Sequence, residues 1–287
     1  MKENSQIKIS PCKQGRIVFL GTPEFGVNVL EELKKEGIIP SLIITAPNKP
    51  KGRKLILTPP PVKVWAEENN IPVIQPKILE IRDLKLEIGE IDIALVIAYG
   101  KLIPKKILDI PQYGFLNVHP SLLPKFRGAS PVKEIILKGE KETGTTIMLL
   151  DEELDHGPII AQKKIKLNGK ITSRELEEKL AKESGKLLAK VIPKWIKGEI
   201  KAQEQDHSQA TYTKKIKKED GLVDLEKDNP ELIYRKFRAF QPWPGIYFFK
   251  NNKRVIIKEA EYKDNVFIIK KVLPESRRII NYLDFLR

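Results

Sequence analysis

Residues 16–21 read RIVFLG, a continuous apolar run that ends in glycine, and residues 24–35 follow with the apolar spacing of a helix. The same succession recurs along the chain. We expect further strands at residues 38–45, 71–74, 91–98, 114–119 and 143–150, and further helices at residues 61–69, 79–87 and 130–138. Strands that alternate with helices favour parallel pairing, and such near-continuous apolar strands suit a sheet covered on both faces. The sequence therefore predicts an α/β fold with a mostly parallel sheet and functional residues at the carboxyl ends of its strands.

The pattern changes in the second half of the chain. Residues 159–166 are expected to return as an antiparallel strand, and residues 173–196 to form a long amphipathic helix with Ser173 as its N-cap. Residues 202–213 are polar and lack periodicity, so we interpret them as a linker. Beyond them we predict a helix at residues 230–239, short strands at 246–249, 254–262 and 266–272 joined by hairpin turns, and a closing strand or helix within 277–287. This pattern indicates a second, smaller domain that is mostly β.

The composition points to a protein with an anionic partner. The chain has 287 residues, enough for two domains, and its 52 basic against 38 acidic residues give a net charge of +14. Such an excess favours nucleic acid or an anionic cofactor, although an evenly solvated lysine-rich surface is the alternative. The single Cys12 excludes an internal disulfide and a cysteine-based zinc site. Together with the lack of a membrane-length apolar run, this favours a cytoplasmic protein, and residues 1–15 are expected to be a loosely packed extension.

A basic segment lies between residues 47 and 66, where no acidic residue occurs. Its cationic side chains are Lys49, Lys51, Arg53, Lys54 and Lys63. The segment follows a predicted strand at the expected functional edge of the sheet, where loops commonly carry recognition. We therefore predict that it binds nucleic acid; the alternative is a solvated connection. Residues 205–287 add 18 basic and 12 acidic residues, a net charge of +6, so the basic excess spans both predicted domains.

The turn GTPEFG at residues 21–26 does not match a phosphate-binding fingerprint. It lacks the GxGxxG spacing and the Walker lysine, and Pro23 removes a donor N–H. We therefore expect an ordinary tight turn before the first helix, and no NAD or ATP site.

Asn117 and His119 are two residues apart on a predicted strand, so their side chains point to the same face near its end. A carboxamide donates hydrogen bonds to a developing oxyanion, and an imidazole exchanges a proton near neutral pH. Asp155 follows another predicted strand, and a carboxylate beside an imidazole fixes the tautomer of the ring. Alone, His119 would suit a loop cap and Asp155 an Asx-turn. In combination, these groups favour catalysis of attack on a carbonyl.

Several motifs resemble the folate-dependent formyltransferases. They are NVHPSLLP at residues 117–124, RGASP at 127–131, TGTTI at 143–147 and LDHG at 154–157. Other segments are similar to the branch of that family that acts on methionyl-tRNA: FLGTPEF at 19–25, the basic segment from PNKPKGRK at 47–54 to TPPPVK at 58–63, and AYGKLIP at 98–104. The similarity extends from residue 16 to QPWP at residues 241–244.

The resemblance implies a fold and an activity. The fold is a Rossmann-like catalytic domain at residues 16–203, followed by a short OB-like tRNA-binding domain at residues 205–287. The activity is transfer of a formyl group from the co-substrate 10-formyltetrahydrofolate to the α-amino group of methionyl initiator tRNA, for translation initiation, without a metal. Catalysis falls to Asn117, His119 and Asp155, and folate binding to Ser121, Leu122, Leu123 and Pro124. Ile97 would line an apolar slot for the pterin, although it suits an ordinary core equally well, and Lys49, Lys51, Arg53 and Lys54 are the candidates for tRNA contact.

Two alternatives stay open. The first is the same chemistry on the amine of a nucleotide or nucleotide sugar, against which the basic segment and the C-terminal region argue. The second is a noncatalytic RNA-binding protein on an enzyme scaffold, against which the complete set of Asn117, His119 and Asp155 argues. We therefore expect methionyl initiator tRNA as the partner of a monomeric protein that binds neither DNA nor a membrane.

Overall fold

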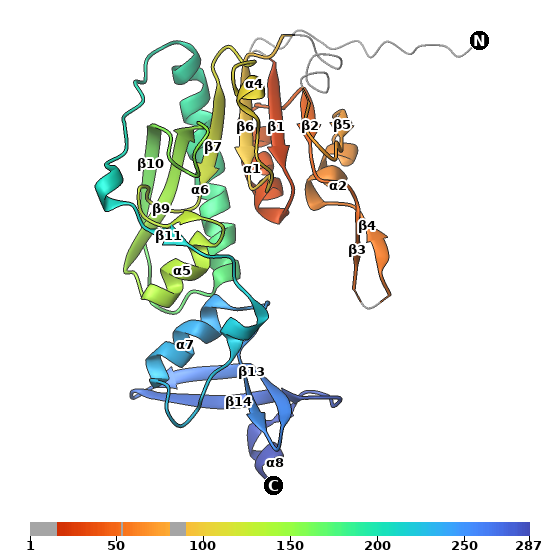
Figure 1. Cartoon of the computed structure of the whole chain (residues 1–287), viewed down its shortest axis with the longest axis vertical. Helices are drawn as coiled ribbons and strands as arrows, with labels where there is room; N and C mark the ends of the chain where they lie inside the picture. Colours follow the sequence, from red (N-terminus) through yellow and green to blue (C-terminus); the bar gives the residue numbers. More distant parts are fainter. Residues whose placement is uncertain (1–15, 53, 81–89) are drawn as a thin grey trace, which may run out of the picture. The chain divides into compact units, whose positions relative to one another are not determined.

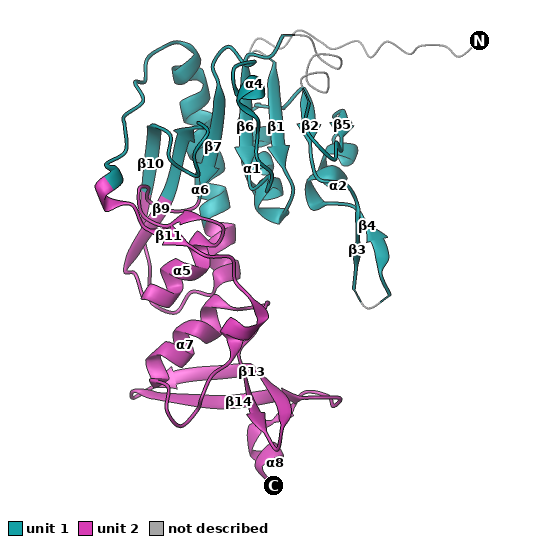
Figure 2. Ribbon diagram, in the orientation of Figure 1, with its two compact units in different colours: residues 1–119, 145–163, 180–207 teal, residues 120–144, 164–179, 208–287 magenta. Residues whose placement is uncertain are grey.

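The computed structural model describes residues 16–52, 54–80 and 90–287, which fall into two compact units (Figure 2). Unit 1 takes the described residues within 1–119, 145–163 and 180–207. Unit 2 takes those within 120–144, 164–179 and 208–287. The chain therefore passes between the units several times.

A seven-stranded sheet forms the centre of the α/β part (Figure 1). Its strands, in spatial order, are β10 (Ile159–Lys166), β9 (Glu142–Leu149), β7 (Phe115–His119), β6 (Ile93–Ile97), β1 (Ile17–Gly21), β2 (Leu42–Ile44) and β5 (Val73–Ile74). Strand β1 pairs in parallel with β2 and β6, and β6 in parallel with β7, whereas β9 is antiparallel to β7. The predicted mostly parallel sheet is confirmed.

Strands β1, β2 and β6 are apolar and buried throughout because both faces of the sheet are covered there. In β1, Ile17 and Phe19 belong to one core cluster, and Val18 and Leu20 to another on the opposite face. The first cluster includes side chains of three helices: α1 (Glu24–Lys35), α2 (Pro61–Glu68) and the C-terminal part of α6 (Ser173–Ile196). The second includes Ile107 of the short helix α4 (Lys105–Leu108). Helices on both faces are what a parallel sheet requires.

The strand order reverses direction between β1 and β6. From β1 the chain runs outward to β2 and β5, and then returns to β6 and β7 on the other side of β1. Open parallel sheets bind ligands at the carboxyl ends of their strands near such a reversal. His119 is the last residue of β7, so the predicted catalytic residues lie at this edge.

The basic segment folds as a hairpin rather than as an irregular loop. Strand β3 (Lys49–Lys51) pairs antiparallel with β4 (Ile56–Thr58), with Lys49 opposite Thr58 (Figure 1). The hairpin begins shortly after β2, and Gln75 holds its base by donating hydrogen bonds to the Ala46 carbonyl at 2.6 Å and to Asn48 Oδ1 at 3.0 Å. The helix expected at residues 79–87 lies mostly outside the described residues.

Unit 2 contains the packed helices α5 and α7 and a separate antiparallel sheet. Helix α5 (Pro131–Lys138) contacts α7 (Pro230–Ala239). The sheet has the order β12 (Tyr247–Lys250), β13 (Lys253–Lys263), β14 (Val266–Pro274) and β15 (Ile280–Asn281), and helix α8 (Tyr282–Leu286) follows it. Asn251, Asn252, Asp264 and Asn265 all have positive φ, as two-residue hairpin turns demand. A smaller, mainly β C-terminal region is therefore confirmed.

One local prediction was wrong. Thr172, not Ser173, caps α6: Thr172 Oγ1 accepts from the Glu175 amide, and the Glu175 carboxylate accepts from the Thr172 amide at 2.8 Å. Ser173 instead donates to the Gln241 carbonyl at 2.6 Å. The polar stretch at residues 202–213, which we interpret as a linker, includes the 3-10 turn η1 (His207–Gln209) and strand β11 (Tyr212–Thr213), and β11 pairs with β8 (Arg127–Gly128). The side chains of this stretch do not form one apolar face, so the sequence shows no hydrophobic periodicity there.

Candidate active site

Strand β7 delivers Asn117 and His119 to the same side of the sheet in unit 1. Asn117 lies opposite Val96 of β6 and Met148 of β9, and His119 lies opposite Thr146 of β9. Both side chains are buried, with Asn117 8% and His119 4% exposed. Because neighbouring strands fix β7 on both sides, neither polar group can turn away without breaking the sheet register.

Asp155 completes the set. Its Oδ2 lies 3.6 Å from Nδ1 of His119, and both side chains are largely withdrawn from water. This distance exceeds that of a hydrogen bond but is short enough for an ion pair with the protonated ring. The structure thus brings together the three residues that the sequence suggested.

The loop that carries Asp155 has a specific backbone. Asp155 has a φ of 49°, in the left-handed region that aspartate tolerates better than most residues. A Cβ at Gly157 would overlap the Leu149 carbonyl oxygen, so the loop lies against the end of β9 only with glycine at that position. The motif LDHG therefore combines the carboxylate of Asp155 with a glycine that the close approach to β9 requires.

Gln205 is the residue of this site that sequence reasoning missed. Its side chain is 5% exposed, and Nε2 donates to the carbonyl oxygens of Asp155 at 3.0 Å and Gly157 at 2.7 Å. Gln203, two residues earlier, is paired with Ile159 at the start of β10 through both of its main-chain groups. In the sequence, Gln205 sits in a polar run, which gives no signal that its side chain is buried.

The other two histidines lie beside the site and are engaged differently. His156 Nδ1 lies 2.7 Å from Asp151 Oδ2, and its ring stacks on His207 with centroids 4.0 Å apart. Both rings are more accessible than that of His119. Of the three histidines in the chain, His119 is therefore the one with the enclosed position that a proton-transfer group in a catalytic site requires.

The residues expected to bind folate fall in both units. Ile97 ends β6 in unit 1 and is fully buried in the core cluster with Phe19. Ser121 to Pro124 follow β7 directly and belong to unit 2. Within unit 2, Ser121 is buried and its hydroxyl donates to the Lys125 carbonyl at 2.7 Å, while Leu122 is partly exposed. Leu122 thus keeps accessible apolar surface shortly after β7 in sequence.

The residues expected to contact tRNA are on or next to the β3–β4 hairpin. Lys49 and Lys51 are exposed on β3, and Lys54 is exposed in the turn. Arg53 lies outside the described residues. Three apolar side chains of the hairpin are also exposed: Leu55, Ile56 and Leu57 are 71%, 63% and 64% accessible. Neighbouring cationic and aliphatic side chains that face solvent are typical of a binding surface.

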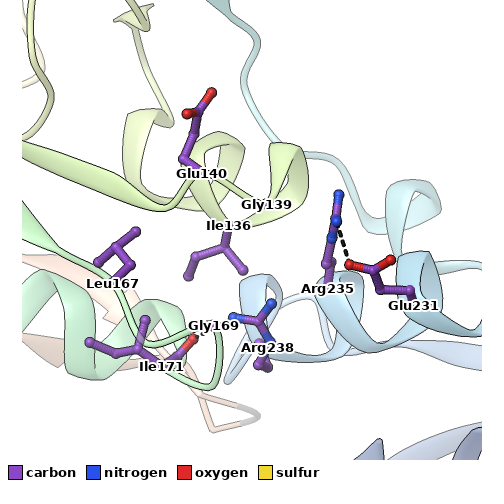
Figure 3. A pocket seen from close by; sticks show the side chains of 9 residues that line it. All are labelled: Ile136, Gly139, Glu140, Leu167, Gly169, Ile171, Glu231, Arg235 and Arg238. Atoms are coloured by element: carbon purple, nitrogen blue, oxygen red, sulfur yellow. Dashed lines mark hydrogen bonds and ion pairs between the residues drawn. The ribbon is translucent and has the colours of Figure 1, made fainter. Parts of the chain in front are cut away.

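Unit 2 also contains a pocket, which is lined by charged and apolar side chains (Figure 3). Arg235 pairs with Glu231 in this pocket, and Arg238 donates to the Ile171 carbonyl at 3.0 Å. Burial lowers the pKa of Arg238 below its ordinary value. The remaining lining residues are Ile136, Gly139, Glu140, Leu167 and Gly169. Its charges are balanced or bonded within unit 2, and none of the sequence-predicted site residues lines it, so the site at the end of β7 is the stronger candidate.

A carboxamide, an imidazole and a carboxylate at one strand end can stabilise an oxyanion and move a proton. Among the described residues, no group of three or more metal-ligating side chains is arranged to hold an ion. None of the helices described combines the length and apolar character needed to cross a membrane. The fold and the site fit the class of α/β enzymes that transfer acyl groups.

Comparison with known families makes this class specific. Residues 15–192 match the formyl transferase family, and residues 215–286 match the C-terminal domain of formyl transferases. The chain belongs to the formyl transferase family. The methionyl-tRNA formyltransferase of Chloroflexus aurantiacus is 43% identical over 248 residues, which is 85% of this chain and 80% of the relative. That of Thermotoga maritima is 42% identical over 271 residues, 94% of this chain and 84% of the relative.

Solved structures share the fold at low sequence identity. Methionyl-tRNA formyltransferase from Clostridium thermocellum superimposes with a TM-score of 0.62 at 20% identity, covering 93% of this chain and 99% of that one. An N-formyltransferase from Helicobacter canadensis, solved with folinic acid and dTDP-3-aminofucose, gives a TM-score of 0.63 at 19% identity, with 88% and 94% covered. These similarities support the two-part architecture.

Proposed function

We propose that this protein transfers the formyl group of 10-formyltetrahydrofolate to the α-amino group of methionyl initiator tRNA. The observation that carries the proposal is the buried pairing of His119 with Asp155, beside Asn117 on the same strand face. The relatives that are 42–43% identical over most of the chain, all named methionyl-tRNA formyltransferase, support the choice of substrate.

The chemistry follows from these groups. The methionyl amine attacks the formyl carbon, and the carbonyl oxygen gains negative charge as the new C–N bond forms. The Asn117 amide and the protonated His119 ring donate hydrogen bonds to that oxygen, in a setting where desolvation strengthens them. Asp155, 3.6 Å from the ring, orients His119. It assists transfer of the amine proton to N10 of the donor while the bond between N10 and the formyl carbon breaks and tetrahydrofolate leaves.

The donor would be held next to the catalytic strand. We assign it Ser121, Leu122, Leu123 and Pro124, which follow His119 in the chain, together with Ile97 at the end of β6. Leu122 offers partly exposed apolar surface suited to a pterin ring, whereas Ile97 would shape the site from within the core. Bound there, the donor supplies the activated formyl group.

For tRNA we assign two basic regions. The first is the hairpin segment with Lys49, Lys51, Arg53 and Lys54, and the second is the C-terminal region from residue 205 to 287 with its net charge of +6. Residues 16–203 would then form the catalytic domain. Exposed lysines suit the phosphate backbone of tRNA, and each contact releases counterions on binding.

The test is a transfer assay with competing acceptors. Purified protein is mixed with 10-formyltetrahydrofolate labelled in the formyl group and with methionyl initiator tRNA, methionyl elongator tRNA or a dTDP-amino sugar. We expect label on the initiator tRNA, recovered as formylmethionine after hydrolysis of the ester. Label on the amino sugar, or on no acceptor at all, would overturn the proposal.

A further inference from the structure

The Asp155 loop is held in place from a distant part of the chain. One carboxamide nitrogen, Nε2 of Gln205, reaches the carbonyl oxygens of Asp155 and Gly157, on either side of His156. The side chain is enclosed, and the backbone pairing of Gln203 with Ile159 fixes the direction from which it arrives. The loop is thus clamped at two points by the two hydrogens of a single amide.

This clamp acts where the loop backbone is least favourable. A residue with positive φ other than glycine lies in a sparsely populated region, and such a conformation persists only where the surroundings enforce it. The direction of the Asp155 side chain follows from that backbone. Release of the two carbonyls would let the residue relax and move its carboxylate away from Nδ1 of His119.

We propose that Gln205 is a positioning residue that holds the Asp155 carboxylate against His119. The two carbonyl oxygens to which its amide donates belong to the Asp155 loop, so Gln205 acts on His119 through Asp155. The turnover measurements below rest on the proposed function, whereas the spectroscopic measurement does not.

The first experiment compares Gln205→Met with Gln203→Met in the full-length protein. Methionine matches glutamine in length but donates no hydrogen bond. Gln203 pairs through its main chain, which the substitution retains, so it is a matched control in the same segment. We expect Gln205→Met to lower kcat by about 10- to 100-fold, the scale of a small misplacement, with KM for both substrates unchanged. Gln205→Asn, which keeps the amide on a shorter arm, should be intermediate and serves as the test variant if Gln205→Met does not fold.

A double-mutant cycle separates positioning from a general structural role. In the Asp155→Asn background, Gln205→Met should cost almost nothing further, because the group it positions is already lost. A full additional loss of kcat, or a kcat equal to that of wild type for Gln205→Met, would overturn the inference.

The second readout needs no turnover. The nitrogen resonances of the His119 ring report the carboxylate beside it, and the chain has only three histidines to assign. We expect Gln205→Met to shift the His119 signals in the direction seen for Asp155→Asn, and Gln203→Met to leave them in place. Wild-type His119 signals in folded Gln205→Met would overturn the inference even if the protein formylated no acceptor.

Discussion

Asn117 and His119 share one direction because they lie two residues apart on a strand whose side chains alternate between faces. Asp155 reaches them from a loop that only its tertiary contacts define. The carboxamide and the imidazole are thus fixed by local geometry, whereas the carboxylate depends on the packing of a distant segment. Burial strengthens the hydrogen bonds and ion pairs of these polar side chains, because the local dielectric is lower than that of water.

We predict that Asn117→Ala, His119→Ala and Asp155→Ala each reduce turnover while the protein remains folded and binds tRNA. Loss of one oxyanion donor costs about 10²–10³ in rate, so Asn117→Ala should fall in this range. Single-turnover formylation with saturating tRNA measures the effect, and circular dichroism verifies the fold. A folded variant that formylates at the wild-type rate would remove that residue from the mechanism.

The three groups should also act as one unit. The double variant Asn117→Ala, His119→Ala is expected to lose less activity than the product of the two single losses, because each single change already disables the shared stabilisation of the oxyanion. Multiplicative losses would show instead that the two side chains work independently.

The first turn of a helix leaves backbone N–H groups that a side chain can satisfy. The reciprocal bonds between Thr172 and Glu175 form such a cap for α6, the longest helix described. The same bonds from Thr172 lower the pKa of Glu175 below its ordinary value of 4.5. A depressed folded-state pKa means that the charged carboxylate stabilises the helix above that ordinary value, and that this contribution is lost as the pH falls through the folded pKa.

We therefore predict a pH-dependent effect of Glu175→Gln. At pH 7 this variant should unfold more readily than wild type in urea, and Thr172→Ala should lose about 1 kcal/mol, typical of a helix cap. Near pH 3 the difference between Glu175→Gln and wild type should shrink. Glu178→Gln is the control: this is the same change three residues further along α6, where the carboxylate pairs with Arg174, and it should change the stability less at pH 7. Equal pH dependence in both variants would contradict the cap.

The β3–β4 hairpin is the element through which unit 1 is expected to meet tRNA. We predict that Lys49→Ala, Lys51→Ala and Lys54→Ala together weaken tRNA binding and spare folate binding. Each lost phosphate contact should reduce the slope of log affinity against log salt by about 0.7–0.9. The matched control changes Lys182, Lys186 and Lys190 to Ala, three exposed lysines of α6 that alter the net charge equally. The same loss of affinity in both triple variants would mean that net charge, and not the hairpin, attracts tRNA.

For the whole molecule, the basic excess is divided between the two units, so each can be tested without the other. Lys214, Lys215, Lys217 and Lys218 form an exposed cluster near the start of the C-terminal region. We predict that their joint change to Ala raises KM for methionyl-tRNA and leaves single-turnover chemistry at saturating tRNA unchanged, because none of the three residues to which we assign catalysis belongs to unit 2. An unchanged KM at physiological salt would make the C-terminal region a structural addition.

The two regions should contribute independently if they contact different parts of one tRNA. A variant that combines the hairpin and C-terminal changes is expected to show the sum of their effects on the free energy of binding. Binding isotherms at several salt concentrations measure this sum. A combined effect no larger than one of its parts would indicate that the regions compete for the same phosphates.

Much of the architecture is written in local patterns. The continuous apolar runs of β1, β6 and β7 predicted buried parallel strands, because a strand whose two faces are both buried carries apolar side chains at successive positions. The long helix α6 matched its predicted range at both ends, and the asparagine-rich turns of the C-terminal sheet followed from the positive φ that hairpins require. The motif around Asn117 and His119 also predicted that both side chains lie on one face of a strand, since spacing by two is a property of the strand itself.

The tertiary structure alone decided how segments far apart in the chain support the site. Nothing in the polar run around Gln205 distinguishes a buried amide from an exposed one, because a single hydrogen-bonded side chain leaves no periodic trace. The helix cap is a second case: both Thr172 and Ser173 have a hydroxyl that suits an N-cap, but the Ser173 hydroxyl donates to the Gln241 carbonyl instead. Strand β11 is a third case, because it is a strand only through its pairing with β8. Sequence patterns report repeated burial along one element, whereas isolated polar contacts depend on a partner that only the folded chain brings within hydrogen-bonding distance.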